Sequence, residues 1–199
     1  MQSDNMARKV AVIDTGAGNL FSLFASCKRM GLAPYLVKNA QELKEQAFDI
    51  LVIPGQGHFG KVMQQLRQSQ LADAIVRWYQ SDKQIIAICV GMQIFFESSQ
   101  EAPNVPGLSL LEGTIEKLNS PKRPMVGWCE LDSPLDYLQS KTVYFVNSYA
   151  VKSSELATSS VTYGERFVSS IRSRNLFAFQ FHPEKSGATG EEILQSCLV

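Results

Sequence analysis

A cysteine, a histidine and a glutamate in two distant segments have the types and spacing of a nucleophilic site. Cys89 lies where the apolar run 85–88 meets a glycine and then a helical pattern. A sharp strand-to-helix turn exposes such a side chain, and the beginning of a helix favours negative charge, so Cys89 can become a reactive thiolate. The competing interpretation is a small cysteine in the core, because free cysteine is among the most buried residue types.

A second segment, near the C-terminus, favours the catalytic interpretation. Residues 178–181 alternate like a strand and are followed by His182 and Glu184, whose spacing directs both side chains to one face. A nucleophile needs a base to take its proton, and the base needs a third group that fixes its orientation. The other histidine, His58, lies in a glycine-rich turn without such an acid, and we interpret it as a surface or helix-start residue. Cys89, His182 and Glu184 are therefore the predicted catalytic triad.

Composition narrows the class of protein. A chain of 199 residues is expected to form one domain, spanning 1–199, with a substantial core. Its 19 basic and 19 acidic residues give no electrostatic reason to expect nucleic acid or a membrane surface as a partner. The four cysteines are widely spaced, which argues against a zinc site or a disulfide framework, and we expect no cofactor. Without a signal-peptide pattern or a long apolar stretch, the expected location is the cytoplasm.

The elements that would position the triad alternate between strands and helices. Apolar runs predict strands at 9–13, 34–37, 49–53 and 84–88, and helical patterns follow at 20–30, 41–46, 59–79 and 92–98. This alternation predicts an α/β fold with a doubly wound, mostly parallel sheet and helices on both faces. The second half predicts added antiparallel strands, at 113–118, 125–131, 142–148, 161–168 and 175–181, and a last helix from residue 190.

The loops at the carboxyl ends of the parallel strands are where a ligand is expected. Gly55 and Gln56, in the glycine-rich loop after the third strand, and Val90, after the nucleophile, can turn backbone amides toward a developing negative charge. These amides form the predicted oxyanion hole of an acyl-transfer reaction. The loop 14–19 has two glycines but lacks the third glycine of a dinucleotide-binding fingerprint, so it is weak evidence for a nucleotide site.

Three motifs, in this order, resemble the signatures of class I glutamine amidotransferases. They are the segments 54–57, 87–93 and 180–185. The resemblance implies the flavodoxin-like fold of that family and the hydrolysis of L-glutamine to glutamate and ammonia. In that reaction Cys89 would attack the side-chain amide, His182 would protonate the departing ammonia, and Glu184 would hold His182.

The same resemblance implies residues that hold glutamine and a partner that receives the ammonia. The implied glutamine-holding residues are Gln93, Asn147, Ser148 and Tyr149. Segments at 13–20, 125–131 and 144–149 resemble, more narrowly, the glutaminase subunits of imidazole glycerol phosphate synthases. Those subunits form a heterodimer with a (β/α)₈ cyclase subunit in histidine biosynthesis. The resemblance also places Trp128 on a strand that would face this subunit.

Three positions depart from the family pattern and keep other functions open. Ala87 stands where glycine is typical, Cys129 where asparagine is common, and Asn147 where histidine is common. One alternative is the same glutaminase chemistry supplying a paralogous synthase, such as a sugar-aminating enzyme. Another is a cysteine peptidase, which would cleave peptides without a partner. A third is a non-catalytic binding subunit, which would keep its function after Cys89→Ala.

Overall fold

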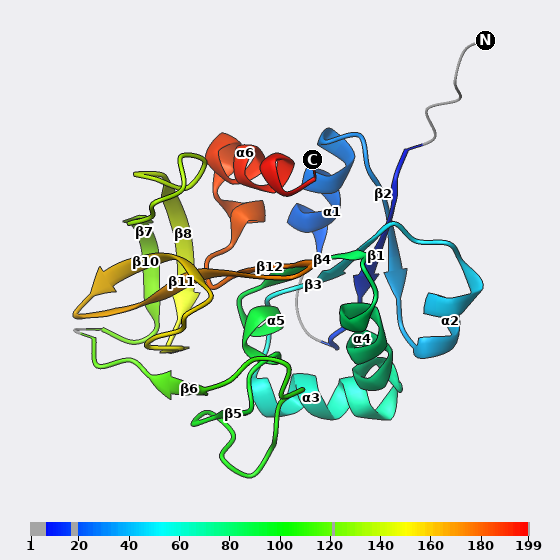
Figure 1. Cartoon of the computed structure of the whole chain (residues 1–199), viewed down its shortest axis with the longest axis horizontal. Helices are drawn as coiled ribbons and strands as arrows, with labels where there is room; N and C mark the ends of the chain where they lie inside the picture. Colours follow the sequence, from blue (N-terminus) through cyan, green and yellow to red (C-terminus); the bar gives the residue numbers. More distant parts are fainter. Residues whose placement is uncertain (1–6, 17–19, 121, 199) are drawn as a thin grey trace.

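A computed structural model describes residues 7–16, 20–120 and 122–198, so residues 17–19 of the glycine-containing loop lie outside the described residues. Its centre is a seven-stranded sheet in the order β10-β11-β12-β4-β3-β1-β2 (Figure 1). Neighbouring strands from β12 to β2 are parallel, whereas β10 and β11 are antiparallel additions. The predicted α/β sheet, with added antiparallel strands, is confirmed. The strands are β1 (Lys9–Ile13), β2 (Ala33–Val37), β3 (Ile50–Ile53), β4 (Gln84–Ile88), β10 (Ala157–Tyr163), β11 (Glu165–Ser173) and β12 (Leu176–Phe179).

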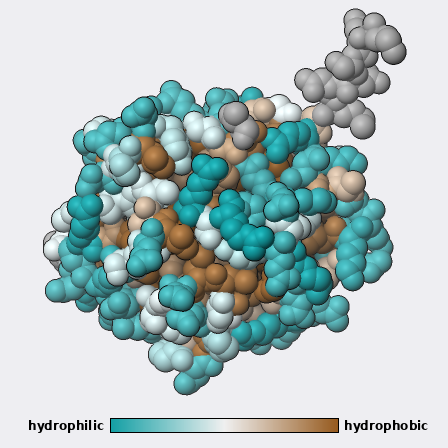
Figure 2. Space-filling view, viewed as in Figure 1, coloured by the Kyte–Doolittle hydropathy of each residue, from teal (hydrophilic) through white to brown (hydrophobic). Residues whose placement is uncertain are grey.

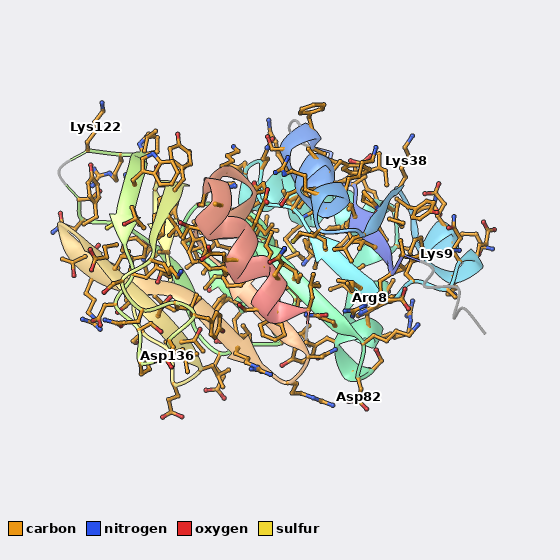
Figure 3. The ribbon with its side chains drawn as sticks, turned by 90° about the horizontal axis from the view of Figure 1, so that it is seen from above. Arg8, Lys9, Lys38, Asp82, Lys122 and Asp136 are labelled. Carbon is orange, nitrogen blue, oxygen red and sulfur yellow. The ribbon has the colours of Figure 1, made fainter. Side chains whose placement is uncertain are left out.

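Helices cover both faces of this sheet, as predicted (Figure 1). One face carries α1 (Phe21–Arg29) and α6 (Gly187–Cys197), which lie side by side in Figure 3 and are joined by an ion pair between Arg29 and Glu191. The opposite face carries α2 (Ala40–Glu45), α3 (Phe59–Gln68), α4 (Leu71–Gln80) and α5 (Val90–Gln93).

The central strands are buried because alternate side chains enter two different cores. In β1, Val10 and Val12 pack with α1 and α6, whereas Ala11 and Ile13 pack with α3 and α4. All four side chains are fully buried. Burial of each larger aliphatic side chain contributes about 1.5–3 kcal/mol, so the apolar strand sequences stabilise a sheet that is covered on both sides.

Smaller sheets lie beside the carboxyl ends of the central strands. The β7–β8 ribbon is an antiparallel pair formed by β7 (Met125–Glu130) and β8 (Thr142–Asn147). It lies at one end of the molecule, near Lys122 in Figure 3. A second small sheet contains β5 (Ser98–Ser99), β6 (Thr114–Lys117) and β9 (Tyr149–Ala150). A short 3-10 helix, η1 (Pro183–Lys185), follows the last strand.

Three expected elements differ from those in the structure. The predicted helix 59–79 is broken into α3 and α4, because Gln70 adopts a left-handed backbone conformation with φ of 59°. The predicted helix 92–98 ends at Gln93, since the carbonyls of residues 94–96 accept hydrogen bonds from residues 108–111. The predicted strand 161–168 is a hairpin, because Gly164 turns with φ of 77°, a conformation that glycine adopts readily.

Surface polarity is uneven on the face shown in Figure 2. Hydrophilic side chains cover its edges, and hydrophobic side chains show mainly near its middle. In the described part of the chain, every helix is too short or too polar to cross a bilayer.

Candidate active site

Cys89 occupies a strained turn between β4 and α5. Its backbone has φ of 49° and ψ of −112°, an unfavourable conformation for a residue with a side chain, which costs of order 1–3 kcal/mol. The Cys89 amide donates a hydrogen bond of 2.6 Å to Phe179 O at the end of β12. The predicted strand-to-helix turn is thus confirmed, and the surrounding sheet supports the strain.

The glycine-rich loop after β3 packs directly against this turn. A Cβ atom on Gly55 would lie 2.5 Å from Ile88 O and 2.6 Å from Cys89 Cβ. A Cβ atom on Gly91, in α5, would lie 2.3 Å from Ile53 O. Neither position has room for a side chain, so the two glycines allow the loop backbone to approach the nucleophile.

His182 and Glu184 meet Cys89 because β12 is the parallel neighbour of β4. Phe179 lies opposite Ile88 in that pairing, so the residues that follow the two strands emerge together. His182 Nδ1 lies 2.8 Å from Glu184 Oε1, which leaves Nε2 as the ring nitrogen for Cys89. Both side chains are almost fully buried. The three predicted triad residues are brought together in this structure.

The charge state of His182 reflects two opposing influences. Burial alone would lower its pKa, but hydrogen bonds and charge interactions with Cys89 and Glu184 raise the pKa from 6.5 to about 10. The imidazole ring is therefore favoured in its protonated form at neutral pH. Such a ring can stabilise an adjacent thiolate and later donate a proton.

A cavity of about 170 Å³ opens beside Cys89. It contains six of the residues predicted to bind or react with the substrate: Cys89, Val90, Gln93, Asn147, Ser148 and Tyr149. Gly57, Glu101, Pro124 and Val146 complete its lining. Asn147 Oδ1 is buried without a hydrogen-bond partner. The cavity therefore combines the nucleophile with several polar groups that a small ligand can contact.

The predicted oxyanion hole is consistent in its location with this arrangement. The Val90 amide is the first of α5, and the first amides of a helix have no acceptor within the helix. Gly55 contacts the Cys89 turn, and Gln56 follows it in the loop. The assignment of these three amides remains a prediction.

Two buried glutamine side chains connect the cavity wall to Cys89. Gln93 Nε2 donates hydrogen bonds of 3.0 Å to both Tyr149 O and Gln180 Oε1. Gln180 Nε2 lies 3.6 Å from Cys89 Sγ. Because both hydrogens of the Gln93 amide are used within the protein, this side chain can offer a ligand only its carbonyl oxygen.

Sequence reasoning assigned no individual role to Glu101, Pro124 or Gln180, whereas Gly57 belongs to the loop predicted to supply the oxyanion hole. Glu101 accepts a hydrogen bond of 2.7 Å from the Phe59 amide at the start of α3, which brings its carboxylate to the cavity. No sequence pattern marks Glu101, since this contact joins two distant segments. Gln180 carried a signal, because it precedes His182 by two residues and shares its strand face.

The remaining sequence expectations concern His58, metals and Ala87. His58 is an exposed residue at the start of α3, where its Nδ1 accepts a hydrogen bond from the Gly60 amide, as expected. Among the described residues, no cluster of histidine, cysteine or acidic side chains has the arrangement of a metal site. Ala87 is fully buried in β4, between Ile53 and Ala178 on the neighbouring strands, so its methyl group fits the packing.

Known proteins share both the sequence pattern and the fold. Residues 11–199 match the model of the family described as glutamine amidotransferase class-I. The chain is 36% identical to imidazole glycerol phosphate synthase subunit HisH of Thermotoga maritima, with 96% of each chain covered. It is 40% identical to the subunit of that name from Oceanobacillus iheyensis, over 94% of this chain and 96% of the relative. A solved glutamine amidotransferase has the same fold, with a TM-score of 0.77 at 18% identity and coverage of 95% and 96%. The chain belongs to the class I glutamine amidotransferase family.

Proposed function

We propose that this chain is the glutaminase subunit of an imidazole glycerol phosphate synthase, folded as one amidotransferase domain. It hydrolyses L-glutamine to L-glutamate and ammonia, and a (β/α)₈ cyclase subunit receives the ammonia in histidine biosynthesis. The observation that carries this proposal is Cys89 on a strained turn, with the His182–Glu184 pair, beside a cavity fit for one amino acid. The HisH relatives support the choice of synthase. The free thiols suit a reducing cytoplasm.

The reaction proceeds through a thioester. The Cys89 thiolate attacks the side-chain carbonyl carbon of glutamine, and the resulting oxyanion is stabilised by the amides of Val90 and the loop after β3. As the C–N bond breaks, protonated His182 donates its proton to the departing ammonia. Neutral His182 then takes a proton from water, whose oxygen attacks the thioester and releases glutamate. Glu184 holds the imidazole ring in one orientation during both steps.

The polar groups of the cavity suit the backbone of a free amino acid. The Glu101 carboxylate is an anionic acceptor on the cavity wall, and Gln93 can present its carbonyl oxygen. Asn147 Oδ1 is an unpartnered acceptor beside them. An α-ammonium group would supply donors to these acceptors and would recover the cost of the unsatisfied Asn147 oxygen. Recognition of a free amino acid also distinguishes this site from a peptidase groove.

An exposed apolar patch on the β7–β8 ribbon offers a surface for the cyclase subunit. Val126 and Trp128 are 58% and 57% exposed. The Trp128 ring packs edge-on against Tyr144 at 5.7 Å between centroids, and Val146 links the patch to the cavity. Large exposed aromatic residues are typical anchors of protein interfaces. A partner on this patch would lie next to the place where ammonia is released.

The test is glutamate release from L-glutamine, measured for this chain alone and with the cyclase subunit of a histidine operon plus its nucleotide substrate. The expected result is strong stimulation by the cyclase subunit and loss of glutamate release in Cys89→Ala. Stimulation by a sugar-aminating synthase instead would establish the alternative client. Glutamate release that persists in Cys89→Ala would overturn the nucleophile assignment.

A further inference from the structure

Gln180 is a completely buried polar side chain that contacts the sulfur of Cys89 without belonging to the proposed triad. It follows β12 and has no exposed surface. Its Nε2 atom lies 3.6 Å from Cys89 Sγ, and its Oε1 atom accepts a hydrogen bond of 3.0 Å from Gln93 Nε2. Both ends of this amide are therefore engaged, one with the nucleophile and one with the cavity wall.

The orientation of the Gln180 amide is determined by a backbone carbonyl. Tyr149 O can only accept hydrogen bonds, so Gln93 must direct its NH₂ group toward Tyr149. The same NH₂ group then requires an acceptor from Gln180. A flipped Gln180 would place its NH₂ group against that of Gln93 and its oxygen against the sulfur. The donor end of Gln180 is thus held toward Cys89.

The sulfur of Cys89 lies between one group that stabilises the neutral thiol and one that stabilises the thiolate. Val146 O, on β8, lies 3.7 Å from Sγ and can accept a hydrogen bond only from the neutral thiol. The Gln180 N–H can donate to the sulfur, and this bond is stronger when the sulfur is negatively charged. Gln180 therefore favours the thiolate and fixes its position, whereas Val146 favours the thiol.

We propose that Gln180 is a positioning residue for the nucleophile, which holds the Cys89 thiolate through an amide orientation imposed by Gln93 and Tyr149. This inference rests on the proposed role of Cys89. Tyr149 and Gln93 thus have a second role besides holding glutamine, because they orient the Gln180 donor that contacts the sulfur of Cys89. Gln180 acts through Cys89 and is not required to touch the substrate.

The test compares two substitutions that remove the donor with a matched control. Gln180→Met removes the N–H at similar volume, and Gln180→Leu removes it with a branched side chain of similar volume. Gln84→Met is the control, because Gln84 is a hydrogen-bonded glutamine at the start of β4, the end of that strand far from Cys89. The readout is the rate of Cys89 alkylation by iodoacetamide as a function of pH, with the modified peptide quantified by mass spectrometry.

The pH midpoint of alkylation should rise by about one unit in Gln180→Met, since a hydrogen bond to a charged group is lost. It should rise by a similar amount in Gln180→Leu and stay unchanged in Gln84→Met. In the assembled synthase, kcat for glutamate release should fall about 10-fold in Gln180→Met, with KM for glutamine within about 2-fold.

The outcomes separate this inference from the proposed function. An unchanged midpoint and kcat in either folded Gln180 variant would show that Gln180 only fills space, and the inference would be wrong. Gln180→Leu supplies this result if Gln180→Met does not fold. Activity that survives Cys89→Ala would instead remove the nucleophile assignment, and this inference with it. Loss of activity in Cys89→Ala together with wild-type behaviour of the Gln180 variants would overturn the inference alone.

Discussion

The carboxyl ends of β3 and β4 and the β7–β8 ribbon border the same cavity, but they are packed very differently. On the sheet side, Ile53 and Ile88 are fully buried, and the loop after β3 has no room for a methyl group at Gly55. On the ribbon side, Val126 and Trp128 leave more than half of their surface exposed. The reacting groups therefore lie on the rigid side, and the ribbon has surface to offer a partner.

This difference follows from how each region obtains its stability. The strands β3, β4 and β12 bury side chains on both faces and are hydrogen-bonded to neighbours on both edges. A two-stranded ribbon is marginal by itself and depends on its inward residues, here Val143 and Phe145, which are fully buried. The opposite face of the ribbon carries Trp128, whose exposed side chain does not contribute to this buried packing. Substitutions on the two sides should therefore affect different measurements.

The largest effect is expected on the sheet side, at Glu184. Glu184→Gln should lower kcat for glutamate release about 1,000-fold, because the substituted amide no longer holds a protonated His182. The folded structure should be retained. The matched control is Glu191→Gln, which removes a carboxylate from an ion pair between α1 and α6. Equal kcat values for the two variants, measured in the assembled synthase, would contradict the role of Glu184.

A second effect concerns the protonation of His182. Its pKa of about 10 lies above the ordinary 6.5, so the ring should stay protonated at neutral pH and lose its proton as the pH rises through about 10. In Glu184→Gln the midpoint should move down, because burial, which disfavours the charged ring, is then opposed by Cys89 alone. Titration of the ring nitrogens by ¹⁵N NMR measures both midpoints. A midpoint that stays the same in Glu184→Gln would contradict the ion pair.

A third prediction tests the tight packing of the sheet side. Gly91→Ala should lower the free energy of unfolding by about 3 kcal/mol, because the new Cβ would lie 2.3 Å from Ile53 O. Helix propensity alone predicts the opposite sign, a gain of about 1 kcal/mol. Gly31→Ala is the control, since nothing lies within 4 Å of its Cβ and only its left-handed backbone costs energy, about 1 kcal/mol. Urea unfolding measures the free energy of unfolding of both variants and of the unchanged chain. A Gly91→Ala variant that is more stable than the unchanged chain would refute the packing argument.

On the ribbon side, the main effect should be on the partner. Trp128→Ala should weaken binding of the cyclase subunit about 30-fold, or about 2 kcal/mol, because an exposed aromatic anchor is removed. Leu36→Ala is the control, since Leu36 is also partly exposed but belongs to β2, the opposite edge strand of the large sheet. Isothermal titration calorimetry measures both affinities. If the two variants bind equally well, the partner docks elsewhere.

The features that could be predicted from the sequence are those defined by local patterns. The parallel strands and the meeting of Cys89 with His182 and Glu184 were predictable, because apolar runs and the spacing of His182 and Glu184 are local patterns. The end of helix α5 at Gln93 was not predictable, because the amides of residues 108–111 donate hydrogen bonds to the carbonyls of residues 94–96, which a longer helix would have used. Glu101 was missed for a similar reason: its place in the cavity depends on the Phe59 amide, 42 residues away in sequence. Contacts between remote segments leave no periodic signal.

The smallest effect is expected at Cys129, on the ribbon. Its sulfur lies 4.0 Å from Thr162 O, and the side chain is partly buried. Cys129→Ser should therefore change kcat by less than about 2-fold and the free energy of unfolding by less than about 0.5 kcal/mol. Partial burial raises the pKa of the Cys129 thiol, so this cysteine should also be alkylated more slowly than Cys89 at neutral pH. Peptide mass spectrometry after brief iodoacetamide treatment compares the two sites. Faster labelling of Cys129 would mean that the ribbon, and not the strained turn, carries the more reactive thiol.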